Sequence, residues 1–168
     1  KEVFAGPGND FILGGSAPDV LLGNEGDDWI EGGEGFDGLS GENSELFFNS
    51  TIIGHDILNG QGNDTDYDGE AGDDIMVQSA GIQRNNGMDG FDWGIHKGDQ
   101  NAADSDLGIR VFDARPALIL RDRFDSVEGL SGWKFDDKLT GAARLLAGEG
   151  FDKVLTQAGV DRIAGLND

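Results

Sequence analysis

Apolar and polar positions recur along the first half of the chain with a period of nine residues. Ile12, Leu21, Ile30 and Leu39 are spaced nine apart, with glycine-rich and acidic segments between them. The three residues centred on each of these positions suffice for a short strand, in which the middle side chain points opposite to its neighbours. The six intervening residues are typical of a tight turn. The pattern predicts stacked short strands and turns around a thin apolar core.

The nine-residue unit is clearest in four consecutive copies that begin at Ala5, Gly14, Gly23 and Gly32. Glycine fills most of positions 1, 2 and 4, aspartate always fills position 6, and an aliphatic residue always fills position 8, which gives G-G-x-G-x-D-x-U-x. A fixed internal period of this kind indicates a repeat architecture. The position-6 residues of these four copies are Asp10, Asp19, Asp28 and Asp37.

The repeat continues to about residue 95 with one insertion and one slip. A fifth unit begins at Gly41 and resumes at Gly54, after the ten inserted residues 44–53. The next aspartate, Asp64, comes one residue early, and we interpret it as position 6 of a shifted sixth unit. Gln83 stands where the eighth unit should have an aspartate. The sequence therefore contains nine units, of which the eighth is defective.

Two units make one coil, and the coils of such a stack lie about 4.8 Å apart. Aspartates 18 residues apart in sequence then face each other across one coil, where two unit charges repel by about 1 kcal/mol in water and by more at lower dielectric. A cation between the turns would relieve this repulsion. Carboxylate and carbonyl oxygens are the ligands that Ca²⁺ prefers, whereas Mg²⁺ requires stricter octahedral geometry. The residues expected in the core are Ile12, Leu21, Ile30, Leu39, Leu58 and Met76.

Composition excludes several classes of protein. The 168 residues contain 33 acidic and 12 basic side chains, and a net charge of −21 is incompatible with binding a nucleic acid backbone. Cysteine is absent, and apolar runs such as 117–120 are too short to span a membrane. Residues 1–6 contain no apolar signal segment, so we expect an export signal and flanking domains of a larger parent protein outside this sequence.

These repeats resemble the calcium-binding nonapeptides of RTX (repeats-in-toxin, haemolysin-type) proteins. The resemblance implies an all-β fold, a parallel β-roll (right-handed β-solenoid), with several Ca²⁺ ions as cofactors. Each ion is implied to lie between turn n and turn n+2. Its ligands are implied to be positions 2, 4 and 6 of the earlier turn and positions 1, 3 and 6 of the later one, through carbonyl oxygens except at position 6.

Carried onto this chain, the resemblance implies six ligand sets. The sets are Gly6, Gly8 and Asp10 with Gly23, Glu25 and Asp28; Gly15, Ala17 and Asp19 with Gly32, Glu34 and Asp37; Asn24, Gly26 and Asp28 with Gly41, Asn43 and Asp56; Gly33, Gly35 and Asp37 with Asn59, Gln61 and Asp64; Glu42, Gly54 and Asp56 with Gly69, Ala71 and Asp74; and Glu70, Gly72 and Asp74 with Gly87, Asp89 and Asp92. A remaining set would place Asp64 against the uncharged Gln83, and we expect that site to be weak or empty.

The charge distribution divides the chain in two. Residues 1–96 carry a net charge of −18 and residues 97–168 only −3. We expect the calcium-binding roll, with its excursion at 44–53, to occupy residues 1–98. Residues 99–168 are expected to form a degenerate continuation of the roll or a C-terminal cap, because a stack of repeats needs a capped end.

Some C-terminal segments carry further resemblances. Residues 125–141 resemble the segment after which an RTX roll resumes, and residues 147–155 fit the nonapeptide again. The runs 90–93, 121–124 and 131–133 resemble RTX regions attached to large bacterial haem-peroxidase-type exoproteins.

We interpret the chain as a calcium-binding RTX module of a secreted, extracellular bacterial protein, exported by type I secretion, that folds on Ca²⁺ after export and acts as a scaffold or spacer. An alternative is an accessory domain of a secreted peroxidase or polysaccharide-modifying enzyme that contributes substrate or surface adhesion. We expect no catalytic residue and no enzymatic activity in this chain. His55 and His96 lie outside any HExxH or triad spacing, so structural or surface roles are expected.

Other interpretations fit the sequence less well. A disordered acidic linker would not keep an apolar residue at every position 8. An ice-binding roll needs Thr and Asn at position 3, and a self-cleaving module needs an Asp-Pro bond, which this chain lacks. Trp29 and Trp93, at position 7, are expected to cover strand edges or contact the C-terminal region. Asp27, Asp73 and Asp136 precede the ligand-type aspartates and are expected to be solvated or to cap turns.

Overall fold

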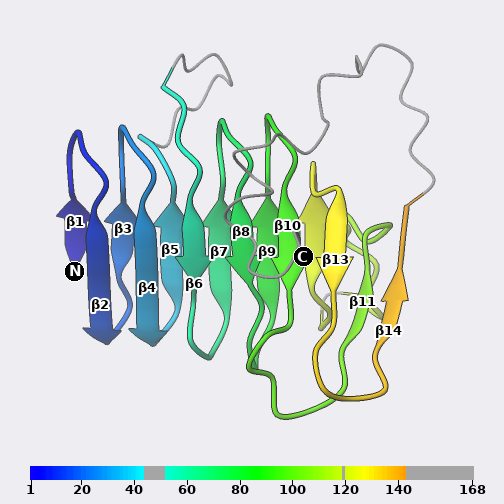
Figure 1. Cartoon of the computed structure of the whole chain (residues 1–168). Helices are drawn as coiled ribbons and strands as arrows, with labels where there is room; N and C mark the ends of the chain where they lie inside the picture. The colour runs from blue at the N-terminus through cyan, green and yellow to red at the C-terminus, as the bar shows by residue number, and fades with distance from the viewer. Residues whose placement is uncertain (44–51, 119, 143–168) are drawn as a thin grey trace.

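The computed structural model describes residues 1–43, 52–118 and 120–142, and these residues form strands and turns without a helix. Consecutive strands of the repeat region alternate between two six-stranded parallel sheets (Figure 1), in the orders β1-β3-β5-β7-β9-β12 and β13-β10-β8-β6-β4-β2. The predicted all-β parallel β-roll is confirmed. The strands are β1 (Glu2–Phe4), β2 (Phe11–Ser16), β3 (Val20–Leu22), β4 (Trp29–Glu34), β5 (Asp37–Ser40), β6 (Ile57–Asn59), β7 (Thr65–Asp68), β8 (Ile75–Val77), β9 (Gln83–Asn86), β10 (Trp93–Ile95), β11 (Asp104–Asp106), β12 (Arg123–Asp125), β13 (Gly129–Ser131) and β14 (Lys138–Thr140).

Each strand of the repeat region pairs with the strand one coil away. Trp29 pairs with Phe11, 18 residues earlier, and with Ile57, 28 residues later. The second separation is larger because the ten-residue excursion lies between these strands. The insertion therefore leaves the strand register intact, as the spacing of the later repeats predicts.

Position 8 of each unit points between the two sheets and builds the core. In one sheet Ile12, Ile30, Leu58 and Met76 stand in register, and in the other Leu21 pairs with Leu39. Complete burial of such a side chain contributes about 2 kcal/mol. The predicted core is confirmed, since Ile12, Leu21, Ile30, Leu39, Leu58 and Met76 are all buried.

The sixth unit is not shifted, and the prediction that Asp64 occupies position 6 is wrong. The register of β7 places Thr65 opposite both Asp37 and Gln83, so Thr65 is at position 6. Tyr67 then occupies position 8 and is 1% exposed. Its hydroxyl donates to the carbonyl of Val77 at 2.7 Å. A slip of one residue would turn every side chain of the strand to the opposite face and would point Asp66 into the core.

The eighth unit places a polar residue at position 8. Asn85 is fully buried and pairs in register with Tyr67 and Phe124. Its amide exchanges two hydrogen bonds with the side chain of Gln78, at 2.7 and 3.1 Å, and also donates to the carbonyl of Arg123. The pair thereby satisfies groups whose burial without partners would be costly.

The position-7 tryptophans lie on the outer face of the second sheet. Trp29 remains 41% exposed and its ring is 6.3 Å from that of Phe11. Trp93 lies over Gly129 of β13, where a Cβ would come within 2.6 Å of the indole ring. Trp93 therefore contacts the C-terminal region, one of the two roles expected for these tryptophans.

The two sheets extend past residue 98 through β12 and β13, while β11 and β14 form a separate pair with Ser105 opposite Leu139. The placement of a domain boundary at 98 stays a prediction. The unit expected at 147–155 and most of the excursion lie outside the described residues. Within the part of the chain described, no helix has the length and hydrophobicity needed to cross a membrane.

Candidate metal-binding turns

The position-6 residues form a row along each edge of the roll. Those preceding β2, β4, β6, β8 and β10 form the first edge, and those at the start of β3, β5, β7, β9 and β12 form the second edge. The first edge consists of Asp10, Asp28, Asp56, Asp74 and Asp92, and the second edge consists of Asp19, Asp37, Thr65, Gln83 and Asp122.

On the first edge, each aspartate after Asp10 accepts a backbone hydrogen bond from the aspartate of the preceding coil. The N–H of Asp28 donates to Oδ1 of Asp56 at 2.7 Å, and the N–H of Asp56 donates to Oδ1 of Asp74 at 2.8 Å. The same bond joins Asp10 to Asp28 and Asp74 to Asp92. This ladder fixes the direction of every carboxylate, so that the second oxygen points into the turn.

That second oxygen has no hydrogen-bond partner. Oδ2 is buried and unpartnered in Asp28, Asp56 and Asp74 of the first edge, and in Asp37 of the second edge. Among the described residues, no Lys or Arg pairs with the three first-edge aspartates. A buried carboxylate without a partner or counter-charge is strongly unfavourable. The turns thus present buried carboxylate oxygens with no basic side chain beside them in the described ranges.

Burial disfavours the ionised form of these carboxyl groups. It raises the pKa of Asp28 and Asp37 above the ordinary value, and raises that of Asp74 well above it. Burial, together with the nearby charge of Asp28, raises the pKa of Asp56 to about 8. The aspartates of this edge would therefore ionise fully at neutral pH only beside a compensating positive charge.

Backbone carbonyls of the turns lie close to the same oxygens. A Cβ on Gly41 would come 2.9 Å from the carbonyl oxygen of Gly69 and would also overlap Oδ2 of Asp56. The corresponding point at Gly69 is 2.6 Å from Oδ2 of Asp74 and 3.1 Å from the carbonyl oxygen of Gly87. Each position-1 glycine of the first edge, namely Gly23, Gly41, Gly69 and Gly87, thus leaves a cradle lined by one carboxylate and one carbonyl oxygen.

The structure brings together the turns of the predicted ligand sets on the first edge. The N–H of position 4 donates to the carbonyl of position 3 one coil later, as in Gly8 to Glu25 at 2.7 Å and Gly72 to Asp89 at 2.8 Å. Gly72 illustrates why glycine is needed at position 4 of this edge, because its φ is +152° and a Cβ there would overlap the carbonyl of Gly54. That these residues ligate calcium stays a prediction.

On the second edge the structure brings the first set together and corrects the next. The N–H of Asp19 donates to Oδ1 of Asp37 at 3.0 Å. The N–H of Gly33, however, donates to the carbonyl of Gly60, so Gly60 and not Asn59 is at position 1. The uncharged Thr65 consequently replaces the predicted Asp64 opposite Asp37. The second edge therefore has two adjacent coils without a position-6 carboxylate, instead of one.

Position 5 forms a second ladder beside the first edge. Oδ1 of Asp27 accepts the N–H of His55 at 3.1 Å, and Oδ1 of Asp73 accepts the N–H of Phe91 at 2.9 Å. Nδ1 of His55 accepts the N–H of Asp73 at 2.8 Å. Asp27 and Asp73 thus cap turns, as the sequence predicts. Asp64 has the same role on the second edge, where it accepts the N–H of Ile82 at 2.8 Å.

Side chains alone do not form a metal site in these turns. Within the ranges that the structure describes, no group of three or more His, Cys, Asp or Glu side chains is placed to hold a metal ion. The oxygens that converge are instead one or two carboxylate oxygens with backbone carbonyls. This donor set agrees with the mixed carboxylate and carbonyl coordination that Ca²⁺ accepts.

Sequence reasoning assigned no role to three acidic side chains of these rows, although it placed the carbonyl of Glu42 in a ligand set. Glu42, at position 2, is fully buried, and its carboxylate accepts the N–H of Gly54 at 2.7 Å. Asp122 accepts the N–H of Gln83 at 2.9 Å, and Glu128 accepts that of Asp92 at 3.1 Å. Glu42 could have been found, since an acidic residue replaces a repeat glycine there. Asp122 and Glu128 lie beyond the regular period and gave no such signal.

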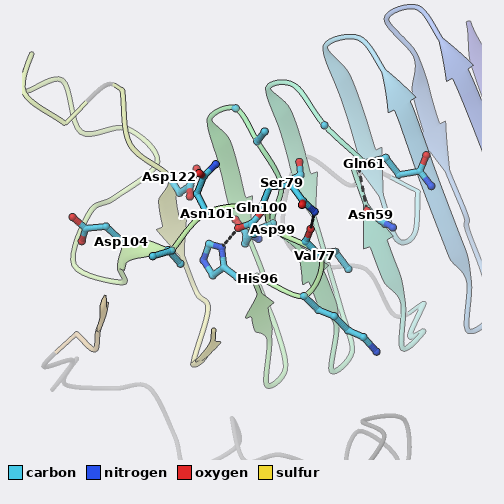
Figure 2. A pocket seen from close by; sticks show the side chains of 18 residues that line it. Asn59, Gln61, Val77, Ser79, His96, Asp99, Gln100, Asn101, Asp104 and Asp122 are labelled. Atoms are coloured by element: carbon cyan, nitrogen blue, oxygen red, sulfur yellow. Dashed lines mark hydrogen bonds and ion pairs between the residues drawn. The ribbon is translucent and has the colours of Figure 1, made fainter. Parts of the chain in front are cut away.

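A cavity of about 650 Å³ lies beside the second sheet, next to the segment that follows β10 (Figure 2). Asn59, Gln61, Gln100 and Asn101 are among the polar residues that line it. His96 also lines the cavity but is only 3% exposed. The cavity is therefore a groove whose polar side chains alternate with apolar ones such as Val77 and Ala102.

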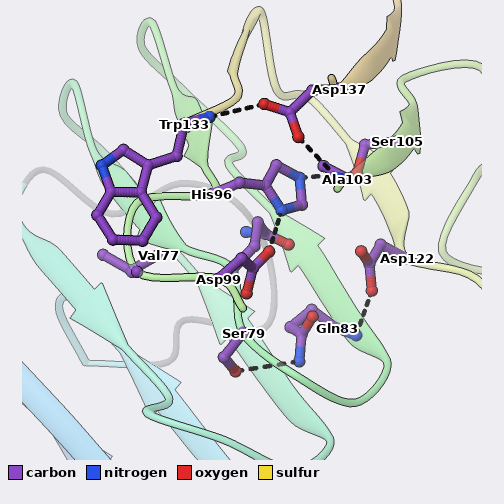
Figure 3. A network of polar contacts seen from close by, with 12 residues as sticks. Val77, Ser79, Gln83, His96, Asp99, Ala103, Ser105, Asp122, Trp133 and Asp137 are labelled. Atoms are coloured by element: carbon purple, nitrogen blue, oxygen red, sulfur yellow. Dashed lines mark hydrogen bonds and ion pairs between the residues drawn. The ribbon is translucent and has the colours of Figure 1, made fainter. Parts of the chain in front are cut away.

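His96 belongs to a buried polar network (Figure 3). Its Nδ1 is 2.7 Å from Oδ2 of Asp99, and its Nε2 is 2.8 Å from Oγ of Ser105. The arrangement resembles a Ser-His-Asp triad in its distances. Ser105, however, is 1% exposed and does not line the cavity, so its hydroxyl is out of reach of a substrate there. The network connects the segment after β10 to β11.

Comparison with known proteins gives one positive result. The family model of the RTX calcium-binding nonapeptide repeat matches residues 4–39 and 136–168, with four copies. Neither the curated proteins nor the solved structures that were compared gave a match. The matched residues include the first four units of the roll, whose position-6 aspartates form the start of both edges. The chain contains RTX calcium-binding nonapeptide repeats, which imply that it binds Ca²⁺.

Proposed function

We propose that this chain is a calcium-dependent folding module of a secreted protein, which folds after export and then serves as a scaffold or spacer between flanking domains. The observation that carries the proposal is the row of buried, unpartnered carboxylate oxygens on Asp28, Asp56 and Asp74. The chain's role is structural in this proposal, and it has no catalytic activity of its own.

The charge of the first edge explains why folding should depend on a cation. Three buried carboxylates that pair with no Lys or Arg among the described residues oppose folding, because each must leave water as an ion or take up a proton. A divalent cation that binds only the folded turns shifts the equilibrium toward the folded state. Metal binding and folding are coupled in this way whenever the site does not exist in the unfolded chain.

The available ligands favour Ca²⁺, and the affinity expected for it determines whether the chain folds inside or outside the cell. Oδ2 of Asp28 and of Asp56, with the carbonyls of Gly26 and Gly41, offer hard oxygen donors without a rigid octahedral frame. Extracellular calcium modules bind with dissociation constants of about 10⁻⁴ to 10⁻³ M. A chain with this affinity stays unfolded in a calcium-poor cytosol, passes through a type I export channel, and folds outside the cell.

Circular dichroism of the chelated chain tests the proposal. Titration with Ca²⁺ is expected to produce a cooperative coil-to-β transition, and the same concentrations of Mg²⁺ are expected to leave the spectrum unchanged. A β-sheet spectrum that is identical before and after EDTA treatment would contradict calcium-dependent folding.

Adhesion to a hydroxyl-rich polymer is a second candidate function, favoured by the groove beside the second sheet. Asn59, Gln61, Gln100 and Asn101 line this groove, and side-chain amides can donate to and accept from hydroxyl groups. Affinity electrophoresis of the calcium-loaded chain in gels containing soluble polysaccharides tests it. Retardation that the Gln100→Ala/Asn101→Ala variant loses supports adhesion, and unretarded migration in every gel contradicts it.

A further inference from the structure

Glu42 departs from the repeat in both identity and placement. It stands at position 2 of the fifth unit, where the first and fourth units have Gly6 and Gly33. Its side chain is fully buried, although glutamate is almost never buried without a partner. It lies immediately before the excursion, and Gly54, which follows the excursion, donates its N–H to Oε1 of Glu42 at 2.7 Å. Glu42 therefore joins the two ends of the insertion by a hydrogen bond, and its carboxylate lies inside the turn.

Three oxygens converge beside Gly54. The point where a Cβ on Gly54 would lie is 3.1 Å from Oε1 of Glu42 and 3.2 Å from Oδ2 of Asp56, and it overlaps the carbonyl oxygen of Gly26. Two carboxylates and one carbonyl thus surround one small volume, which only a glycine leaves open. At the equivalent points of Gly26, Gly72 and Gly90, the three nearest heavy atoms include the carbonyl oxygen of the preceding coil but no carboxylate oxygen.

These two carboxylates have no compensating charge in the described part of the chain. Oδ2 of Asp56 is buried and unpartnered, and Glu42 accepts only backbone N–H groups, from Gly54 and Ala71. No Lys or Arg pairs with either residue in the described ranges. Two buried anions so placed stabilise a folded chain only if a cation lies between them.

We propose that the side chain of Glu42 is an additional calcium ligand, outside the repeat pattern, which acts with Asp56 and the carbonyl of Gly26 in the site between the third and fifth turns. This inference rests on the proposed function. The site has one more negative charge than the sites built from position-6 aspartates alone. Since ligand charge tunes calcium affinity, it binds Ca²⁺ more tightly than its neighbours and fills first.

Glu70 shows that an acidic residue at position 2 need not have this role. It occupies the same position one coil later, but its Oε1 accepts a hydrogen bond from Oγ of Ser40 at 2.8 Å. Its carboxylate is therefore engaged with a hydroxyl group of the facing turn. The additional ligand is a property of Glu42 and its position at the base of the insertion.

Calorimetric Ca²⁺ titration of the full chain and of Glu42→Gln tests the inference. Glutamine preserves the shape and one acceptor oxygen, which can keep the hydrogen bond from Gly54 at 2.7 Å, while it removes the charge and the acceptor of the longer 3.4 Å bond from Ala71. The wild-type chain is expected to show one ion bound more tightly than the rest, and the variant is expected to bind that ion roughly ten- to a hundredfold more weakly with the total number of ions unchanged. Glu2→Gln, which removes a charge from an exposed residue of β1, is the matched control and is expected to behave as wild type.

Terbium luminescence provides a second readout close to the site. Trp29 directly follows Asp28, which the predicted ligand sets place in this site and in the one before it, so excitation of the indole sensitises Tb³⁺ bound in both. Glu42→Gln is expected to move one of the two luminescence phases to higher Tb³⁺ concentration by a similar factor and to leave the other unchanged.

The outcomes separate this inference from the proposed function. A wild-type chain that binds no Ca²⁺ overturns the proposed function. Calcium binding by wild type with an unchanged Glu42→Gln isotherm overturns only the inference, and then Glu42 merely caps the N–H of Gly54. If the variant does not fold in saturating Ca²⁺, the wild-type titration alone tests the inference. One ion bound more tightly than the rest supports it, and a single class of identical sites overturns it.

Discussion

The backbone N–H of Asp28 donates to Oδ1 of Asp56 at 2.7 Å, although 28 residues separate them in the chain. The distance matches that of the uninterrupted pair formed by Asp10 and Asp28. The turn is therefore the same with or without ten inserted residues. One oxygen of each carboxylate orders the ladder, and the other remains available to a cation.

Replacement of Asp28 by Asn is expected to weaken two adjacent calcium sites, because the predicted ligand sets share this residue. Asparagine can still accept the N–H of Asp10 through its amide oxygen, so the ladder should persist. We expect about a tenfold loss of affinity at each of the two sites, measured by calorimetric calcium titration.

Asp27→Asn is the matched control for this experiment. Asp27 is the exposed neighbour that caps the N–H of His55, a role that asparagine can also fill. Equal affinity losses in the two variants would show that position 6 has no special part in binding.

Protonation of the buried carboxyl groups at low pH is expected to stabilise the ion-free roll, as bound calcium does but to a smaller extent. Burial raises the pKa of Glu42 to about 9, with the charge of Asp56 adding to the effect, and the pKa of Asp56 is raised to about 8. The folded, ion-free chain then holds protons that the unfolded chain releases near its ordinary values of 4.5 and 3.8. Stability rises with pH only where the unfolded state binds more protons, so here it falls as pH rises from about 4 toward 8 or 9.

Circular dichroism of the chelated chain between pH 5 and pH 8 checks this dependence. The β-sheet signal is expected to be larger at pH 5, and saturating Ca²⁺ should remove the difference because ionised ligands then have their counter-charge. A β-sheet signal that grows with pH in the absence of calcium would contradict the burial of protonated carboxyl groups.

Alanine at Gly72 is expected to destabilise the calcium-loaded roll by about 3 kcal/mol, a value at the upper end for overpacking in a rigid site. The residue has φ +152°, and its Cβ would overlap the carbonyl of Gly54 in the adjacent coil. Thermal unfolding measures the effect. Gly38→Ala is the control, since nothing lies within 4 Å of a Cβ there, and its melting temperature should stay close to wild type.

The buried Asn85–Gln78 pair is expected to show strong coupling. Asn85→Leu leaves the Gln78 amide without its partner in the core and should cost about 2 kcal/mol, even though leucine restores the repeat pattern. The double variant Gln78→Leu/Asn85→Leu removes both polar groups and should regain part of this loss. A double-mutant cycle of urea unfolding free energies checks this, and additive effects would contradict it.

The regular part of the fold could be predicted because each unit satisfies the same physical requirement. An inward residue such as Ile30 must alternate with a turn, and its neighbour Asp28 must repeat with the same period. Strand pairing, sheet alternation and the core followed from that period. The insertion before Gly54 could also be recognised, because the spacing resumes after it.

The sixth unit shows where sequence reasoning failed. Asp64 and Thr65 are adjacent, and because the other units have aspartate at position 6, the sequence pattern favours Asp64 for that position in the sixth unit. The register depends on the core, where Tyr67 buries a ring and satisfies its hydroxyl with Val77 and Gly60. Packing of one large residue outweighed the match of one turn residue. The carboxylate of Glu42 was missed for a related reason, because the repeat assigns only a carbonyl to position 2.

The pairing of each strand with the strand 18 residues away also limits how a protein of this kind can change in length. Duplication or loss of eighteen codons inserts or deletes one whole layer, and each surviving turn meets an equivalent neighbour. A change of nine codons would instead exchange the two sheets for everything downstream and would set the unbroken aspartate row against the row interrupted by Thr65 and Gln83. Such genes should therefore grow and shrink in even numbers of repeats.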